Sequence, residues 1–159
     1  MADKVKSTPK GYRSFTPYLI IQGAGRAIEY YKKVFNAKEV VRMASPDGQK
    51  VMHAELKIGN SMVMLADEAP EMGARSPQAV GGTPVHLLLY VRNVDRTFKR
   101  AVKAGGRVVE EPNDKFYGDR SGRITDPFGH EWTLSTHKED LSGDEMDRRA
   151  QAMYSGKQQ

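Results

Sequence analysis

The second half of this 159-residue chain repeats the pattern of its first half, and both halves must therefore fold alike. Three segments align at almost the same shift: residues 18–21 with 88–91 at 70, residues 40–41 with 108–109 at 68, and residues 63–65 with 132–134 at 69. Element order, element length and the phase of apolar residues all agree. We interpret this agreement as a duplicated structural unit rather than a chance match.

Each half predicts the order strand, helix, strand, strand, strand. In the first half the alternation of apolar residues predicts strands over 14–22, 38–44, 49–58 and 61–66, with a helix ending at Asn36. In the second half it predicts strands over 85–91, 107–111, 121–125 and 131–135, with a helix ending at Gly105 and Gly106. The expected fold class is α+β, with two βαβββ modules that form a concave mixed-sheet cleft.

The composition of the remaining segments predicts the domain organisation. Residues 1–13 are expected to be a flexible basic N-terminus, and residues 14–137 one domain, with modules over 14–67 and 85–137 and a connector over 68–84. Residues 138–159 are expected to be a helix and tail. The helix would begin at a capping box from Ser142 to Glu145, and pack on the domain edge or on a partner subunit.

Composition excludes several classes of function. The chain has no cysteine, which rules out disulfides, thiolate nucleophiles and cysteine-bound metals. Its net charge is +5 and its pI is about 9.4, but lysine and arginine alternate with acidic residues, and no nucleic-acid motif is present. We expect no nucleic-acid partner and no membrane partner. The absence of a signal or membrane-spanning segment suggests a cytoplasmic location.

The helix of each module should cover one face of its sheet, which leaves the opposite face for a ligand. Apolar residues such as Phe15, Leu19, Met52, Ala54 and Trp132 fit the helix side. The opposite set mixes apolar and polar side chains, as ligand sites do. It comprises Thr16, Tyr18, His53, Glu55, Met62, Met64, His86, Tyr90, Arg123, Glu131, Thr133 and Ser135.

Three features of this set suggest chemistry. His53 and Glu55 are two residues apart on one strand and so point the same way, and a carboxylate beside an imidazole stabilises its protonated form. They are candidate catalytic residues, although a chance pair on a solvated strand is the alternative. His86 interrupts an apolar strand, either as a third catalytic candidate or as a satisfied core histidine. The segment 116–122 is either a loop at the lip of the pocket or a turn with an Asp119–Arg120 pair.

The motifs VMHAEL, SMVMLADE, FYGDRSG and DPFGHEWTLSTHKED, together with the duplicated module, resemble the vicinal-oxygen-chelate superfamily of glyoxalases, bleomycin-resistance proteins and dioxygenases. The resemblance covers residues 15 to about 140 and is greatest to the PhnB-like branch. It implies a homodimer with clefts built from facing modules. It also implies that metal-binding members hold their metal at the positions of Thr16, Met64, His86 and Thr133. Only His86 is a good ligand for a divalent metal, so we expect no metal.

The leading hypothesis is a glyoxalase/bleomycin-resistance-like protein that binds a small anionic or aromatic ligand without a cofactor. Arg123, Tyr90, Met62 and Met64 would recognise this ligand. Whether it is an enzyme is left open. One alternative is a metal-dependent lyase or isomerase that uses His86, Glu55 and His53. The other is a non-catalytic protein that senses a ligand, binds a partner protein through its basic ends or sequesters a drug. Sequestering a cationic drug fits poorly with a basic chain.

Overall fold

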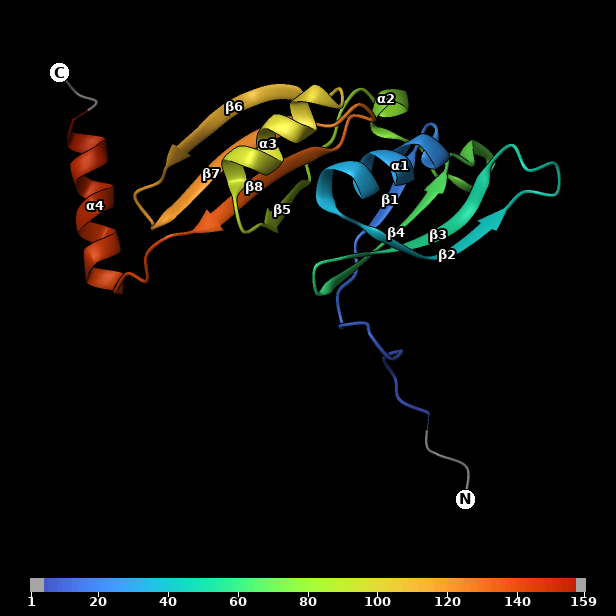
Figure 1. Cartoon of the computed structure of the whole chain (residues 1–159), viewed down its shortest axis with the longest axis horizontal. Helices are drawn as coiled ribbons and strands as arrows, with labels where there is room; N and C mark the ends of the chain where they lie inside the picture. The colour runs from blue at the N-terminus through green and yellow to red at the C-terminus, as the bar shows by residue number, and fades with distance from the viewer. Residues whose placement is uncertain (1–4, 157–159) are drawn as a thin grey trace. The chain divides into compact units, whose positions relative to one another are not determined.

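The computed structural model describes residues 5–156, and the chain divides between Gly82 and Thr83 into two compact units. The first unit contains β1 (Tyr18–Ile21), α1 (Ala24–Phe35), β2 (Lys38–Ala44), β3 (Val51–Ile58) and β4 (Ser61–Asp67). A 3₁₀ turn (Pro70–Met72) and the short helix α2 (Pro77–Val80) follow. The four strands form one mixed sheet in the order β1-β4-β3-β2, in which β1 runs parallel to β4 (Figure 1).

The second unit has the same order of elements. It contains β5 (His86–Tyr90), α3 (Val94–Lys103), β6 (Arg107–Asp114), β7 (Asp119–Thr125) and β8 (Glu131–His137), followed by α4 (Gly143–Ser155). The strand order β5-β8-β7-β6 reproduces that of the first unit, again with one parallel pair (Figure 1). The predicted α+β fold of two βαβββ modules is confirmed.

The strand registers confirm the internal alignment. Tyr18 pairs with Met64 across the parallel strands of the first sheet. The equivalent residues Leu88 and Thr133 pair across the parallel strands of the second. The predicted alignment of β2 with β6 is wrong by one residue, as the pairing of both strands with their neighbours shows. Lys38 and Arg107 are equivalent by pairing, so Val40 aligns with Val109 rather than Val108.

Each long helix buries its apolar stripe on one face of its own sheet. In the first unit the buried residues are Ala24, Ala27, Ile28, Tyr31, Val34 and Phe35 of α1, and Leu19, Ile21, Ala54, Leu56 and Leu65 of the sheet. In the second unit they are Val94, Phe98 and Ala101 of α3, and Ile124, Trp132 and Leu134 of the sheet. We call the face opposite the helix the open face of each sheet.

Two residues expected on the helix side are exposed instead. Phe15 is exposed because β1 begins only at Tyr18, so Phe15 precedes the sheet. Met52 is exposed while its neighbour Val51 is buried. The register shift at the start of β3, opposite Ala44, reverses the alternation there.

A carboxylate at the end of β4 joins the helix to the sheet in the first unit. Asp67 Oδ1 accepts hydrogen bonds from the amides of Gly23 (3.0 Å) and Ala24 (2.9 Å), where α1 begins. Its Oδ2 accepts one from the amide of Val51 (2.8 Å), where β3 begins. Gly23, the residue before the helix, has no side chain that could cap it, so Asp67 satisfies amides that the helix leaves free.

The equivalent position of the second unit performs the same task with a hydroxyl. Thr136 Oγ1 accepts a hydrogen bond from the amide of Val94 at the start of α3 (2.9 Å) and donates one to the carbonyl of Val91 (2.8 Å). Asn93 supplies the second cap, because its side chain accepts from the amide of Arg96 (2.9 Å). Both units therefore fix the start of their helix from the end of their fourth strand.

The C-terminal helix begins at the predicted cap, Ser142. Ser142 Oγ accepts a hydrogen bond from the amide of Glu145 (3.2 Å), and the Glu145 carboxylate contacts the guanidinium groups of Arg148 and Arg149. No residue of α4 is buried. Over residues 5–156, no helix has the length and apolar character needed to span a bilayer.

Replacing Asp67 tests the link between helix and sheet. Asp67→Ala leaves three amides without their acceptor, and it is expected to lower the free energy of unfolding by about 1–3 kcal/mol. Urea denaturation measures the loss. Asp147→Ala, on the exposed surface of α4, is the control, and is expected to change stability by less than about 0.5 kcal/mol. Equal stabilities for the two variants would contradict this role of Asp67.

Candidate functional site

The open face of the first sheet carries a row of predicted site residues. Met64 of β4 pairs with Tyr18 of β1 on one side and with Glu55 of β3 on the other. His53 precedes Glu55 by two residues on β3 and so lies on the same face. Because directly paired side chains lie on one face of a sheet, these four residues form one patch.

Hydrogen bonds connect three members of this patch. The distance from Tyr18 Oη to His53 Nδ1 is 2.9 Å, and the distance from His53 Nε2 to Glu55 Oε1 is 3.3 Å. The tyrosine and histidine rings are tilted by 39° with their centroids 5.6 Å apart. The predicted His53–Glu55 contact is therefore present, and Tyr18 extends it into a chain of three groups.

A residue that the sequence did not suggest completes the cluster. The hydroxyl of Tyr12 is buried beside the Glu55 carboxylate, without a well-aligned hydrogen bond to any described residue. Burial, and then the interaction with Glu55, raises the pKa of Tyr12 to about 12. The contact with Tyr12, followed by that with His53, outweighs burial and lowers the pKa of Glu55. At neutral pH the pair is a phenol and a carboxylate.

Tyr12 lies in the segment predicted to be a flexible basic tail. Its amide donates a hydrogen bond to the carbonyl of Pro9 (3.1 Å), which forms a turn ahead of β1. The sequence offers only one signal for this role, an aromatic hydroxyl within a polar, lysine-rich stretch. Residues 1–4 of that predicted tail, and residues 157–159 of the C-terminal one, lie outside the described residues.

The surroundings of the cluster are apolar. Val41 and Met43 of β2 pair with Glu55 and His53 and are exposed on the same face. Met62 is buried and Met64 is half-buried. Thr16 is half-buried and lies two residues before β1. Apolar side chains around a few polar groups are the composition expected of a site for an organic ligand.

The open face of the second sheet holds the other predicted site residues. His86 pairs with Glu131 across β5 and β8, and Thr133 pairs with Arg123 across β8 and β7. His86 and Tyr90 are exposed. Glu131 accepts a hydrogen bond from the hydroxyl of Thr125 (2.7 Å), which fixes its carboxylate toward β7.

Arg123 is engaged by a carboxylate. Its Nε donates to Glu110 Oε2 at 3.1 Å, and Lys115 contacts the other carboxylate oxygen. Hydrogen bonds from Lys115 and Asn113, and then Arg123, lower the pKa of Glu110 to about 2, so it stays ionised at neutral pH. An anionic ligand at Arg123 would have to compete with this carboxylate. The expected anion recognition by Arg123 stays a prediction.

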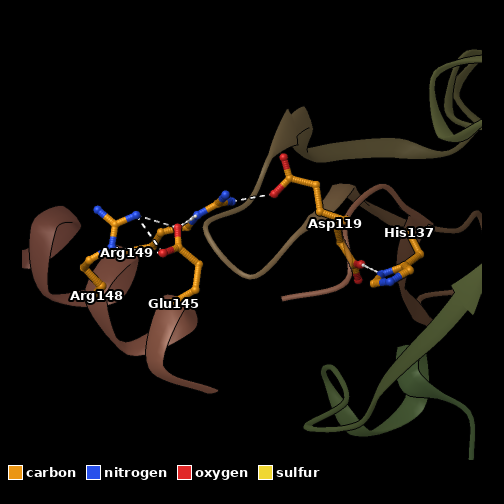
Figure 2. Close-up of polar contacts among 6 residues, drawn as sticks. Asp119, His137, Glu145, Arg148 and Arg149 are labelled. Carbon is orange, nitrogen blue, oxygen red and sulfur yellow. Dashed lines mark hydrogen bonds and ion pairs between the residues drawn. The ribbon is translucent and has the colours of Figure 1, made fainter. Parts of the chain in front are cut away.

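A second polar cluster lies where β7 begins and β8 ends (Figure 2). The buried Asp119 accepts a hydrogen bond from Tyr90 Oη (2.9 Å), and its other oxygen lies 2.7 Å from His137 Nδ1. His137 Nε2 lies 2.9 Å from Asp140. Bonds to Asp119 and then to Asp140 raise the pKa of His137. The bond to Asp119, followed by burial, raises the pKa of Tyr90.

Of the segment 116–122, Asp119 belongs to this cluster, and its carboxylate contacts Tyr90 and His137 rather than Arg120. Arg120 pairs instead with Asp95 of α3 (2.8 Å) and Asp114 of β6 (3.2 Å). Arg149 of α4 contacts two carboxylates, Glu139 at 2.6 Å and Glu145 at 2.8 Å. Figure 2 shows its contact with Glu145. His137 could not be recognised from the sequence alone, because it is distant from Asp119 along the chain and approaches it only through the pairing of β7 with β8.

Comparison with known proteins agrees with this architecture. The family model of the Glyoxalase/Bleomycin resistance protein/Dioxygenase superfamily matches residues 17–134. The chain belongs to this superfamily. Its relatives include Rv0887c, an uncharacterized protein of Mycobacterium tuberculosis, which is 43% identical over 136 residues, covering 84% of this chain and 79% of that protein. An uncharacterized protein of Arabidopsis thaliana is 26% identical over 135 residues, or 80% of this chain and 81% of that protein.

Solved structures show the same fold. TioX of Micromonospora sp. ML1 superposes with a TM-score of 0.63 at 25% identity, covering 79% of this chain and 98% of that one. The PhnB protein of Bacillus cereus has a TM-score of 0.62 at 17% identity, covering 78% and 99%. At 17% identity, the likeness to the PhnB protein shows the fold alone.

The residues present do not fit the metal centre that the superfamily implies. The expected ligand positions hold Thr16, Met64, His86 and Thr133, and of these only His86 offers a nitrogen or carboxylate donor. Among residues 5–156, no three histidine, aspartate or glutamate side chains gather in a way that could hold a metal ion.

The raised pKa of His137 makes the stability of the second unit depend on pH. A group whose pKa is higher in the folded state stabilises the fold below its unfolded value of 6.5, and loses this effect as pH rises through the folded value. The wild-type chain is therefore expected to lose stability as the pH rises above 6.5. Urea denaturation across this range measures it. His137→Gln should show a flatter profile, and an equally steep one would contradict the assignment.

Proposed function

We propose that this chain binds a small organic ligand on the open face of its first sheet, without a metal. The observation that carries the proposal is the connected cluster of Tyr18, His53 and Glu55, with the Tyr12 hydroxyl buried beside the carboxylate. A chance pair on a solvated strand would not be expected to have a buried hydroxyl beside its ionised carboxylate, because burying a polar group costs free energy.

The chemistry of the patch indicates the kind of ligand. Tyr18 and His53 offer hydrogen-bonding groups, while Val41, Met43 and Met64 offer apolar and polarisable contact. The Glu55 carboxylate disfavours an anion next to it. A neutral, aromatic or partly apolar ligand that accepts or donates a hydrogen bond fits this patch best.

In the second unit we propose a matching set of ligand contacts on the open face. His86, Tyr90, Glu131 and Thr133 are presented there, with Arg123 held by Glu110. His86 is proposed as an additional acid, base or orienting group. A homodimer and a cytoplasmic location complete the proposal.

One observation favours a second candidate, a metal-dependent lyase or isomerase. His86 and Glu131 pair directly across β5 and β8, which places an imidazole and a carboxylate on the same face. These are good donors for divalent metals, although two donors are fewer than a stable site needs. The superfamily also contains the fosfomycin resistance protein FosX of Mesorhizobium loti (TM-score 0.57, 20% identity). At that identity the likeness supports the fold alone.

Metal analysis and thermal shift separate the candidates. We expect protein purified without a histidine tag to contain no stoichiometric metal. In a panel of small aromatic and carbonyl compounds, those that raise Tm should do so equally with EDTA present. Glu55→Gln should weaken the affinity for such a compound by about tenfold, as loss of a charged hydrogen-bonding group does.

Glu71→Gln, an exposed carboxylate in the segment after β4, is the matched control and should bind as the wild type does. Stoichiometric metal, together with ligand stabilisation that EDTA abolishes, would overturn the proposal in favour of the metal-dependent candidate. Stabilisation by ligand that is the same in Glu55→Gln as in Glu71→Gln would place the ligand elsewhere.

A further inference from the structure

The direction of the hydrogen bonds in the first cluster follows from the charge of Glu55. Its lowered pKa makes it a carboxylate at neutral pH, and a carboxylate can only accept. The nitrogen of His53 that faces it, Nε2, must therefore carry a proton. In the neutral ring Nδ1 is then an acceptor, and it receives the hydroxyl proton of Tyr18 at 2.9 Å.

This order, carboxylate to imidazole to hydroxyl, is the one by which proteins activate a hydroxyl nucleophile. We infer that Tyr18 is a nucleophile toward small organic electrophiles, with His53 as its general base and Glu55 as a positioning residue. The inference rests on the proposed ligand site and adds the reaction that the site favours.

The exposed fractions of Tyr18, His53 and Glu55 fit these roles. Tyr18 is 48% exposed, whereas the side chains of His53 and Glu55 are 25% and 19% exposed. The reacting group is thus accessible, and the two groups that act through it are more sheltered. Tyr12 stabilises the ionised form of Glu55, because its buried hydroxyl faces that carboxylate.

The second unit offers an internal comparison with the same three kinds of side chain in another order. The hydroxyl of Tyr90 donates to the Asp119 carboxylate, and His137 lies on the far side of that carboxylate. A carboxylate is a weak base, and its contact raises the pKa of Tyr90. Tyr90 is 58% exposed but lacks an imidazole at its hydroxyl. It should be less reactive than Tyr18 although it is more accessible.

Benzenesulfonyl fluoride is a suitable electrophilic probe of this chemistry. Tyr18 Oη would attack the sulfur, so that an O–S bond forms and the S–F bond breaks. The hydroxyl proton passes to His53 Nδ1, and fluoride leaves. The product is a stable aryl sulfonate ester of Tyr18, which peptide mapping by mass spectrometry locates and quantifies.

The experiment compares three tyrosines of the full-length chain within one sample. Tyr154 of α4, which is 63% exposed, reports the reactivity expected from accessibility alone. We expect Tyr18 to be labelled at least about tenfold faster than Tyr154, a modest share of what general-base assistance provides. Tyr90 should be slower than Tyr154. Because each labelling rate is compared with that of another tyrosine in the same sample, a general change in folding would not produce the expected differences.

Three variants divide the roles within the cluster. His53→Phe should reduce the Tyr18 rate to that of Tyr154. Glu55→Gln should lower the rate partially, and Tyr12→Phe should lower it less. Glu71→Gln, the control, should leave the rate of Tyr18 unchanged. Labelling of Tyr18 no faster than Tyr154 in the wild type, or a fast rate that persists in His53→Phe, would overturn the inference.

The thermal-shift screen keeps this inference distinct from the proposed function. Compounds that stabilise the chain while Tyr18 shows ordinary reactivity would support the ligand site and refute the nucleophile. Fast, His53-dependent labelling without any stabilising compound would support the nucleophile and count against a binding function.

Discussion

The start of each long helix is fixed from the last residues of the sheet beneath it, and the two faces of each sheet follow from this link. In the first unit Asp67 accepts the amides that begin α1 and the one that begins β3. In the second, Thr136 occupies the equivalent position and holds the start of α3. With the helix anchored to one face, the polar side chains of opposite phase are left on the other. Both units thus anchor the start of their helix from the same position, the first with a carboxylate and the second with a hydroxyl.

Much of the fold was predictable because it depends on periodicity, which is local in sequence. The element order, most strand limits and the helix cap at Ser142 follow from alternating apolar residues and turn or capping signals. The prediction failed where pairing is irregular, as at Met52, where a register shift reverses the alternation. Irregular pairing depends on the neighbouring strand, and a single sequence does not reveal it.

The candidate site was predictable only where its members share a strand. His53 and Glu55 were expected to meet because two residues on one strand share a face, and they do. Tyr12 and His137 were missed because their partners are distant in the chain and are brought near by tertiary structure. The homodimer, the ligand and the cytoplasmic location stay predictions.

The match to the superfamily spans residues 17–134, and both residues that the sequence failed to indicate lie outside it. Tyr12 precedes the match and His137 follows it, yet each contacts a carboxylate on a strand within the shared fold. Tyr12 lies in the segment before β1, and His137 is the last residue of β8. A family model limited to residues 17–134 therefore leaves out one member of each polar cluster, so residues just beyond the matched region are needed to describe both clusters in full.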